Sequence, residues 1–88
     1  MFKITFNQNT SWYASKSKEA DRMYIRLQET YVNDLLKYRG YVYINQIYEA
    51  LGVKWDTERE NLCCKYNGGN HIDFNVQSVE DGFEITIG

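Results

Sequence analysis

The chain of 88 residues contains no proline and one histidine, and no apolar run approaches the ~20 residues that a membrane-spanning helix needs. The amino terminus has no secretory signal pattern, so we expect a protein that is not secreted. The two cysteines are neighbours, Cys63 and Cys64, whose side chains would point to opposite faces of a strand. We therefore expect reduced thiols and a cytoplasmic location.

Basic charge is not in excess, because ten Lys and Arg stand against twelve Asp and Glu, for a formal net charge of −2. The field of the whole chain therefore does not favour nucleic acid. The charge is unevenly distributed: residues 1–44 hold seven Lys and Arg against four Asp and Glu, whereas residues 45–88 hold three against eight. Such a dipolar domain can orient itself toward a charged partner at low salt.

Tyrosine is abundant, with eight Tyr beside two Trp. It suits a thin core, because the ring can be buried while the hydroxyl stays in water, and it also suits a binding face. Hydrophobic residues make up 43% of the chain and charged residues 25%, which is typical of a folded globular protein. A chain of this length forms one small core, so we expect a single domain over residues 1–88.

A long helix is predicted over residues 17–40, with Ser17 as N-cap and Gly40 in the left-handed conformation that ends a helix. A first apolar stripe with helical spacing consists of Ala20, Tyr24, Leu27, Tyr31, Leu35 and Tyr38. A second stripe, consisting of Ile25, Val32 and Leu36, lies about 120–160° around the helix. We expect the first stripe to pack on a sheet and the second to be covered by another element.

The cover available for the second stripe is a short helix predicted over residues 45–52. That helix would be about 8–11 Å long, whereas Ile25 to Leu36 spans about 16 Å at 1.5 Å per residue. We therefore expect Ile25 to stay at least partly bare. Flanked by Arg22 and Arg26, it would suit a contact with a protein partner or a homodimer contact through the long helix.

Alternating apolar residues predict strands at residues 2–6 and 83–87, with a hairpin at residues 62–76 between the short helix and the last strand. Trp12 and Tyr13 either fold back on the core as a lid or stand on the surface, and we favour the lid because large aromatic residues near a helix start usually pack. The predicted fold class is α+β. An antiparallel sheet of about four strands, made from the N-terminal strand and the C-terminal β-β-β segment, packs on the long helix beside the second, short helix.

The apolar pattern also predicts the pairing within the hairpin. A turn at Gly68–Gly69 places Cys64 opposite Phe74, so that one whole face of the hairpin is apolar. A shift by one residue would place Ile72 opposite Lys65 and lose the pattern.

Metal-ligand and nucleophile types gather in one segment, where they are Cys63, Cys64, His71 and Asp73. Their spacing is not that of a zinc site, and Cys63 would lie roughly 13 Å along the sheet from His71 at 3.3 Å per residue. The same separation disfavours a Cys–His catalytic pair. The glycine pair opens no helix and forms no phosphate loop. We therefore expect no catalytic residue, no metal, no cofactor and no enzyme activity.

A basic face on the long helix supports one functional alternative. Lys18, Arg22 and Arg26 share this face, and Trp12 and Tyr13 precede it. Cations can bind phosphates and aromatic rings can stack on bases, so this alternative is a nucleic-acid-binding module. An ordinary solvated helix face would carry the same residues.

The motif Y-V-x-x-N-x-x-Y-x-x-L-G runs from Tyr41 to Gly52, and I-D-F follows at residues 72–74. In these segments the chain resembles small uncharacterised proteins encoded by phages and mobile elements of Gram-positive bacteria. The resemblance implies a phage or mobile-element origin in a bacterial host and no activity of its own. Phage proteins of this size often act by binding host proteins, so protein binding is the leading functional class. An inhibitor of a host defence nuclease, of the anti-CRISPR kind, is the narrower hypothesis.

An acidic loop would serve such an inhibitor. Trp55 lies in it beside three alternating carboxylates, Asp56, Glu58 and Glu60. Acidic side chains can occupy the basic channel in which a nuclease holds nucleic acid. The same residues could also be ordinary solubilising charges.

Overall fold

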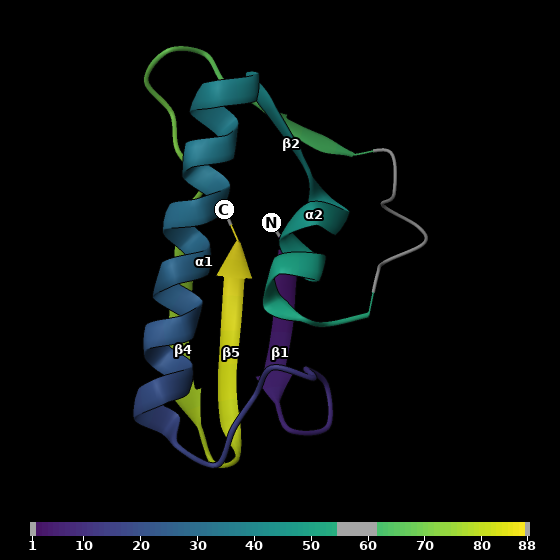
Figure 1. Ribbon diagram of the computed structural model, residues 1–88, viewed down its shortest axis with the longest axis vertical. Helices are drawn as coiled ribbons and strands as arrows, with labels where there is room; N and C mark the ends of the chain where they lie inside the picture. Colours follow the sequence, from purple (N-terminus) through teal and green to yellow (C-terminus); the bar gives the residue numbers. More distant parts are fainter. Residues whose placement is uncertain (1, 55–61, 88) are drawn as a thin grey trace.

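The computed structural model describes residues 2–54 and 62–87, within which the chain forms two helices and five strands (Figure 1). In chain order these are β1 (Phe2–Asn7), α1 (Lys18–Arg39), β2 (Tyr41–Tyr43), α2 (Ile44–Leu51), β3 (Cys63–Lys65), β4 (Phe74–Val79) and β5 (Gly82–Ile87). One antiparallel sheet has the order β1-β5-β4, and β2 pairs with β3 separately. In Figure 1, α1 lies in front of β4 and α2 in front of β1, so both helices cover one face of the larger sheet. The predicted α+β class, with a long helix, a short helix and small antiparallel sheets, is confirmed.

The two ends of α1 are capped as the sequence predicts. Ser17 Oγ accepts a hydrogen bond from the N–H of Ala20 at 3.2 Å. Gly40 has a φ of 85° and donates its N–H to the carbonyl of Leu36 at 2.8 Å. These contacts satisfy backbone groups that a helix end would otherwise leave without partners.

The predicted assignment of the two apolar stripes of α1 is wrong. The second stripe is the core, because Ile25, Val32 and Leu36 are all 0% exposed. Most of the first stripe faces solvent, with exposed fractions of 64% for Leu27, 52% for Tyr31 and 91% for Tyr38. Ile25 is therefore not a bare surface residue, and the predicted partner or homodimer contact at Ile25 is excluded.

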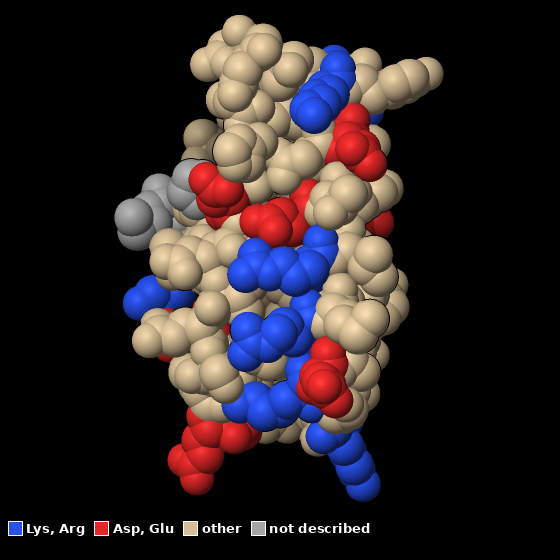
Figure 2. Space-filling model, turned by 90° about the vertical axis from the view of Figure 1, so that its left-hand side faces the viewer, with Lys and Arg blue, Asp and Glu red and all other residues tan. Residues whose placement is uncertain are grey.

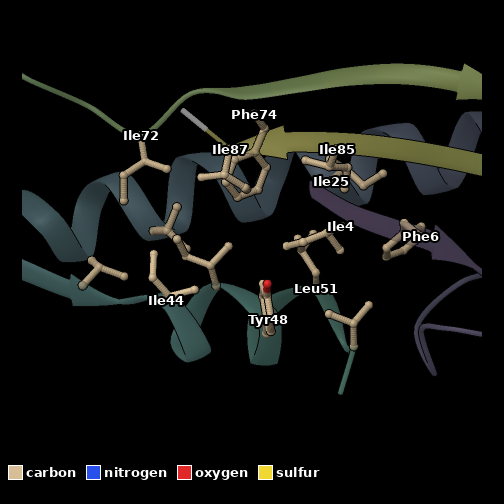
Figure 3. Close-up of a cluster of buried hydrophobic side chains, with 14 of the residues drawn as sticks. Ile4, Phe6, Ile25, Ile44, Tyr48, Leu51, Ile72, Phe74, Ile85 and Ile87 are labelled. Carbon is tan, nitrogen blue, oxygen red and sulfur yellow. The ribbon is translucent and has the colours of Figure 1, made fainter. Parts of the chain in front are cut away.

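The chemistry of the side chains explains which stripe is buried. Figure 3 shows Ile25 beside Ile85 of β5, with Ile4 of β1 and Leu51 of α2 in the same cluster. Aliphatic side chains fill the space between a helix and a sheet without bringing in polar atoms. A tyrosine stripe in that place would bury hydroxyl groups, and each would need a hydrogen-bond partner.

The predicted pairing of the hairpin is also wrong. Cys64 lies opposite Val42 of β2, and Phe74 lies opposite Ile87 of β5. The hairpin that forms is β4–β5, and β1 joins it along the other side of β5. The predicted run of strands is thus divided between two sheets.

Hydrogen bonds to α1 and to Gly40 at its end take the place of the backbone ladder that the predicted hairpin over residues 62–76 would have formed. Asn33 Oδ1 accepts from the N–H of Ile72 at 2.6 Å, and Asn33 Nδ2 donates to the carbonyl of Ile72 at 2.8 Å. Tyr66 N–H donates to the carbonyl of Gly40 at 2.9 Å. Ile72 is therefore buried against α1 although it belongs to no strand.

Candidate protein-binding surface

The exposed apolar side of α1 is the candidate functional surface. We call it the outer stripe, and it consists of Leu27, Tyr31, Leu35 and Tyr38. Leu35 is half-buried and the other three are exposed. A helix that is apolar both toward its core and toward solvent has a face without a partner. Exposed apolar patches of this kind mark sites of protein interaction.

A groove accompanies the outer stripe. α1 and α2 border a hollow of about 270 Å³, lined by Tyr13, Tyr24, Gln28, Tyr31, Leu35, Gln46, Glu49 and Ala50. A second hollow of about 480 Å³ is lined by Tyr31, Asp34, Leu35, Lys37 and Tyr38. Tyr31 and Leu35 line both hollows, so these two residues of the outer stripe border each of them.

Tyr24 fixes the wall of this groove. Its hydroxyl donates to the carbonyl of Ala50 in α2 at 2.6 Å, which ties the two helices together. Its ring stacks on buried Phe6 at 6.2 Å between centroids and meets Tyr13 at 5.4 Å. Burial, with a further contribution from Tyr13, raises the pKa of the Tyr24 phenol above its ordinary value of 10.0. The hydroxyl therefore remains a donor at neutral pH.

The segment before α1 closes one end of the groove. Ser11 Oγ donates to the carbonyl of Leu51 at 2.6 Å, and Trp12 N–H donates to the carbonyl of Gly52 at 3.1 Å. Gly52 has a φ of 72°, and a Cβ at this position would lie 2.4 Å from the ring of Tyr13. The Tyr13 ring meets Tyr24 but stays 51% exposed, and Trp12 beside it is 67% exposed, so neither ring is buried as a lid on the core.

The basic face of α1 lies on its other side, next to β4. Figure 2 shows Lys and Arg side chains in a row on this face of the molecule. Lys18 Nζ donates to Ser78 Oγ at 2.7 Å and also contacts the carbonyl of Val79. The charged ends of Lys18 and Arg22 lie 5.2 Å and 5.1 Å from the centre of the Phe83 ring.

Arg26 completes this row and is engaged in two ways. Its Nη1 donates to Glu29 Oε1 and to the carbonyl of Phe74, both at 3.0 Å. Glu29 Oε2 in turn accepts from the N–H of Phe74 at 2.7 Å. Lys18 and Arg26 of this row therefore help to hold α1 against the sheet, because they bond to backbone groups along the outer edge of β4.

A protein-family model identifies the family to which the chain belongs. Residues 3–87 match the model of a family of unknown function, DUF6353. The chain belongs to this family. No curated protein and no solved structure matches it. The DUF6353 match spans both helices and both sheets, and it assigns no activity to them.

The predicted site residues of this DUF6353 chain do not come together in one place. Trp55, Asp56, Glu58 and Glu60 lie outside the described residues. Ile25 is in the core, and on the far side of α1 from the groove Arg22 lies over Phe83 of β5 and Arg26 bonds to Phe74 of β4. The outer stripe was missed as a site, although its spacing was visible in the sequence as the first apolar stripe.

The cysteines and the histidine are separated as well. Cys63 and Cys64 lie in β3, and burial raises the pKa of the Cys64 thiol, with a smaller contribution from Cys63. His71 Nε2 lies 2.8 Å from Asp73 Oδ1 on the exposed side of the loop before β4. Over residues 2–54 and 62–87, no group of three His, Cys, Asp or Glu could hold a metal ion. No helix in those ranges is long and apolar enough to cross a membrane.

Proposed function

We propose that this chain is a small binding module that engages a protein partner through the outer stripe and its groove. One observation carries the proposal: Leu27, Tyr31 and Tyr38 expose large apolar surfaces along a helix whose opposite face builds the core. Aromatic residues are enriched at protein interfaces, and a few of them often supply most of the binding energy.

The surface is also prepared for binding. α1 is capped at both ends, and the Tyr24–Ala50 hydrogen bond fixes its position against α2. A partner would therefore spend little free energy on ordering the protein, which favours affinity for a given buried area. Tyr31 lines both hollows, so we expect it to contribute most.

The identity of the partner follows from the sequence hypotheses. The resemblance to phage and mobile-element proteins favours a bacterial host protein. A host defence nuclease inhibited by stoichiometric binding, in the anti-CRISPR manner, is the narrower proposal. It would use the acidic residues Asp56, Glu58 and Glu60 in addition to the outer stripe. A second copy of the chain is the other candidate, because the apolar stripe could pair with itself.

The proposal is tested by capture from an extract of the cells that encode the chain, using the purified protein as bait. Wild type is compared with Leu27→Glu, Tyr31→Ala and the control Asn75→Asp, which adds the same charge as Leu27→Glu on the exposed face of the sheet, opposite the uncharged Thr86. We expect both α1 variants to lose the captured protein and the control to keep it. Equal capture by all four proteins would exclude the outer stripe.

Self-association is measured on the same four proteins by analytical ultracentrifugation. If the partner is a second copy, wild type and Asn75→Asp should sediment as dimers and the two α1 variants as monomers. A monomeric wild type that captures no specific protein would overturn the proposed function.

Nucleic-acid binding is the second candidate function, because Lys18, Arg22 and Arg26 form a continuous cationic row. The contacts of Lys18 and Arg26 with β4 weigh against it, since those side chains already have partners. Arg22 carries the least constrained charge of the three, with a ring contact to Phe83. The outer stripe therefore remains the better supported surface.

A further inference from the structure

Different parts of the chain bond to the two outer edges of the three-stranded sheet. Along β4, α1 supplies side chains to the backbone: Asn33 bonds to Ile72, and Glu29 with Arg26 bonds to Phe74. Such contacts occupy polar groups that an edge strand would otherwise offer to another chain. α1 thus covers the beginning of the β4 edge, at Phe74, and the segment just before it with its own side chains.

The β1 edge is covered over only part of its length. Thr10 Oγ1 donates to the carbonyl of Thr5 at 2.6 Å and accepts from the N–H of Asn7 at 2.9 Å, so these groups point away from β5. Backbone groups alternate in direction along a strand, so the N–H and carbonyl of Lys3 and the N–H of Thr5 point the same way. Among the described residues, no hydrogen bond outside the sheet ladders reaches these three groups.

A hollow of about 400 Å³ lies beside this open stretch. Its apolar wall is formed by Ile4, Tyr48 and Val53, which are nearly buried, and Thr10 closes one side. Lys3 and Lys54 also line it, and both are exposed. The Lys3 ammonium lies 3.2 Å from Glu84 on the neighbouring strand. The open backbone, the apolar hollow and the two cations are therefore adjacent.

We infer that the Lys3–Thr5 edge of β1 binds an extended acidic peptide from another protein as an added strand. The peptide's main chain bonds to Lys3 and Thr5, as in other cases of strand addition. In an antiparallel arrangement, the peptide residue opposite Lys3 shares its face of the sheet, so a carboxylate there meets the Lys3 ammonium. The next residue points to the other face, where Tyr48 and Val53 receive an apolar side chain.

Charge selects the acidic peptide over a second copy of the chain. Pairing two β1 edges with Lys3 opposite Lys3 would bring two ammonium groups together on one face, and like charges across paired strands are destabilising. A peptide with alternating acidic and apolar residues satisfies both the cations and the hollow. This site is separate from the outer stripe, so it does not depend on the proposed function.

The probe is a fluorescently labelled eight-residue peptide in which aspartate alternates with valine, titrated by fluorescence anisotropy. We expect saturable binding, and about tenfold weaker binding when lysine replaces aspartate in the probe. Lys54→Glu should weaken binding of the aspartate probe to a similar extent. Lys65→Glu, the same change on the exposed β3 position, should leave it unaltered.

Two methylated copies of the probe test strand addition itself. One carries N-methyl groups on the valine nitrogens and the other on the aspartate nitrogens. Only one alternate set of N–H groups faces β1, so one copy should lose binding and the other should retain it. Equal behaviour of the two copies would contradict strand addition, as would absence of binding by the unmodified probe.

Amide exchange then locates the bound peptide. Exchange of the Lys3 and Thr5 N–H groups should slow at least tenfold when the probe saturates the protein, whereas the Phe74 N–H, already bonded to Glu29, should not change. Protection confined to residues of the outer stripe would overturn the assignment to β1.

Discussion

Replacing Ile25 and Leu27 separately by alanine distinguishes the two faces of α1. The residues are two positions apart on one helix, but Ile25 is 0% exposed and Leu27 is 64% exposed. Ile25→Ala removes buried carbons and leaves a cavity against the sheet, which costs about 2–5 kcal/mol of unfolding free energy. Leu27→Ala removes mainly exposed carbons and introduces the best helix former, so its effect should stay within about 0.5 kcal/mol.

Urea unfolding followed by circular dichroism measures both effects. A loss of ~2–5 kcal/mol is large against the ~5–15 kcal/mol by which small domains are stable, so the unfolding midpoint should fall clearly for Ile25→Ala. Ile25→Glu should prevent folding, because its carboxylate would be buried without a partner. Equal destabilisation by the two alanine variants, or a larger effect of Leu27→Ala, would refute the assignment of the second stripe to the core.

Three further measurements follow from particular contacts. Asn33→Ala should lower the free energy of unfolding in urea by about 2–3 kcal/mol, because it removes two hydrogen bonds to partly buried backbone groups of Ile72. An effect below ~0.5 kcal/mol would show that the loop keeps its position without these bonds. The raised pKa of Tyr24 favours its neutral form in the folded state. Stability should therefore fall as the pH rises above the ordinary value of 10.0, and Tyr24→Phe should reduce that fall. A salt-dependent oligonucleotide titration should detect little binding, and a steep salt dependence that Arg22→Glu removes would instead establish the nucleic-acid alternative.

Local signals in the sequence were sufficient to predict the long helix and the two terminal strands. Ser17 and Gly40 predicted the ends of α1, and both side-chain and backbone contacts there match the expectation. Alternating apolar residues predicted strands near both termini, and β1 and β5 pair along their length. These predictions succeed because capping and alternation depend on neighbours in the sequence.

The pairing of strands depended on contacts distant in sequence. The sequence places Cys64 and Phe74 ten positions apart around a glycine turn, which favours a hairpin. In the structure Cys64 pairs with Val42 and Phe74 pairs with Ile87, and these partners are as apolar as the ones the hairpin would provide. Asn33 bonds to the backbone of Ile72 between the two sheets, and an asparagine within a helix gives no sign of that contact in the sequence.

The candidate site was difficult to predict for a related reason. Hydrophobic periodicity showed that α1 has two apolar stripes, but periodicity reports the number of faces and not which one meets the sheet. The composition of the stripes contained the missing information. The stripe built from Ile25, Val32 and Leu36 has no polar atoms to satisfy, whereas Tyr31 and Tyr38 carry hydroxyls that water satisfies at no cost. On a small domain with two apolar stripes on one helix, the aliphatic stripe belongs against the sheet and the tyrosine stripe faces solvent.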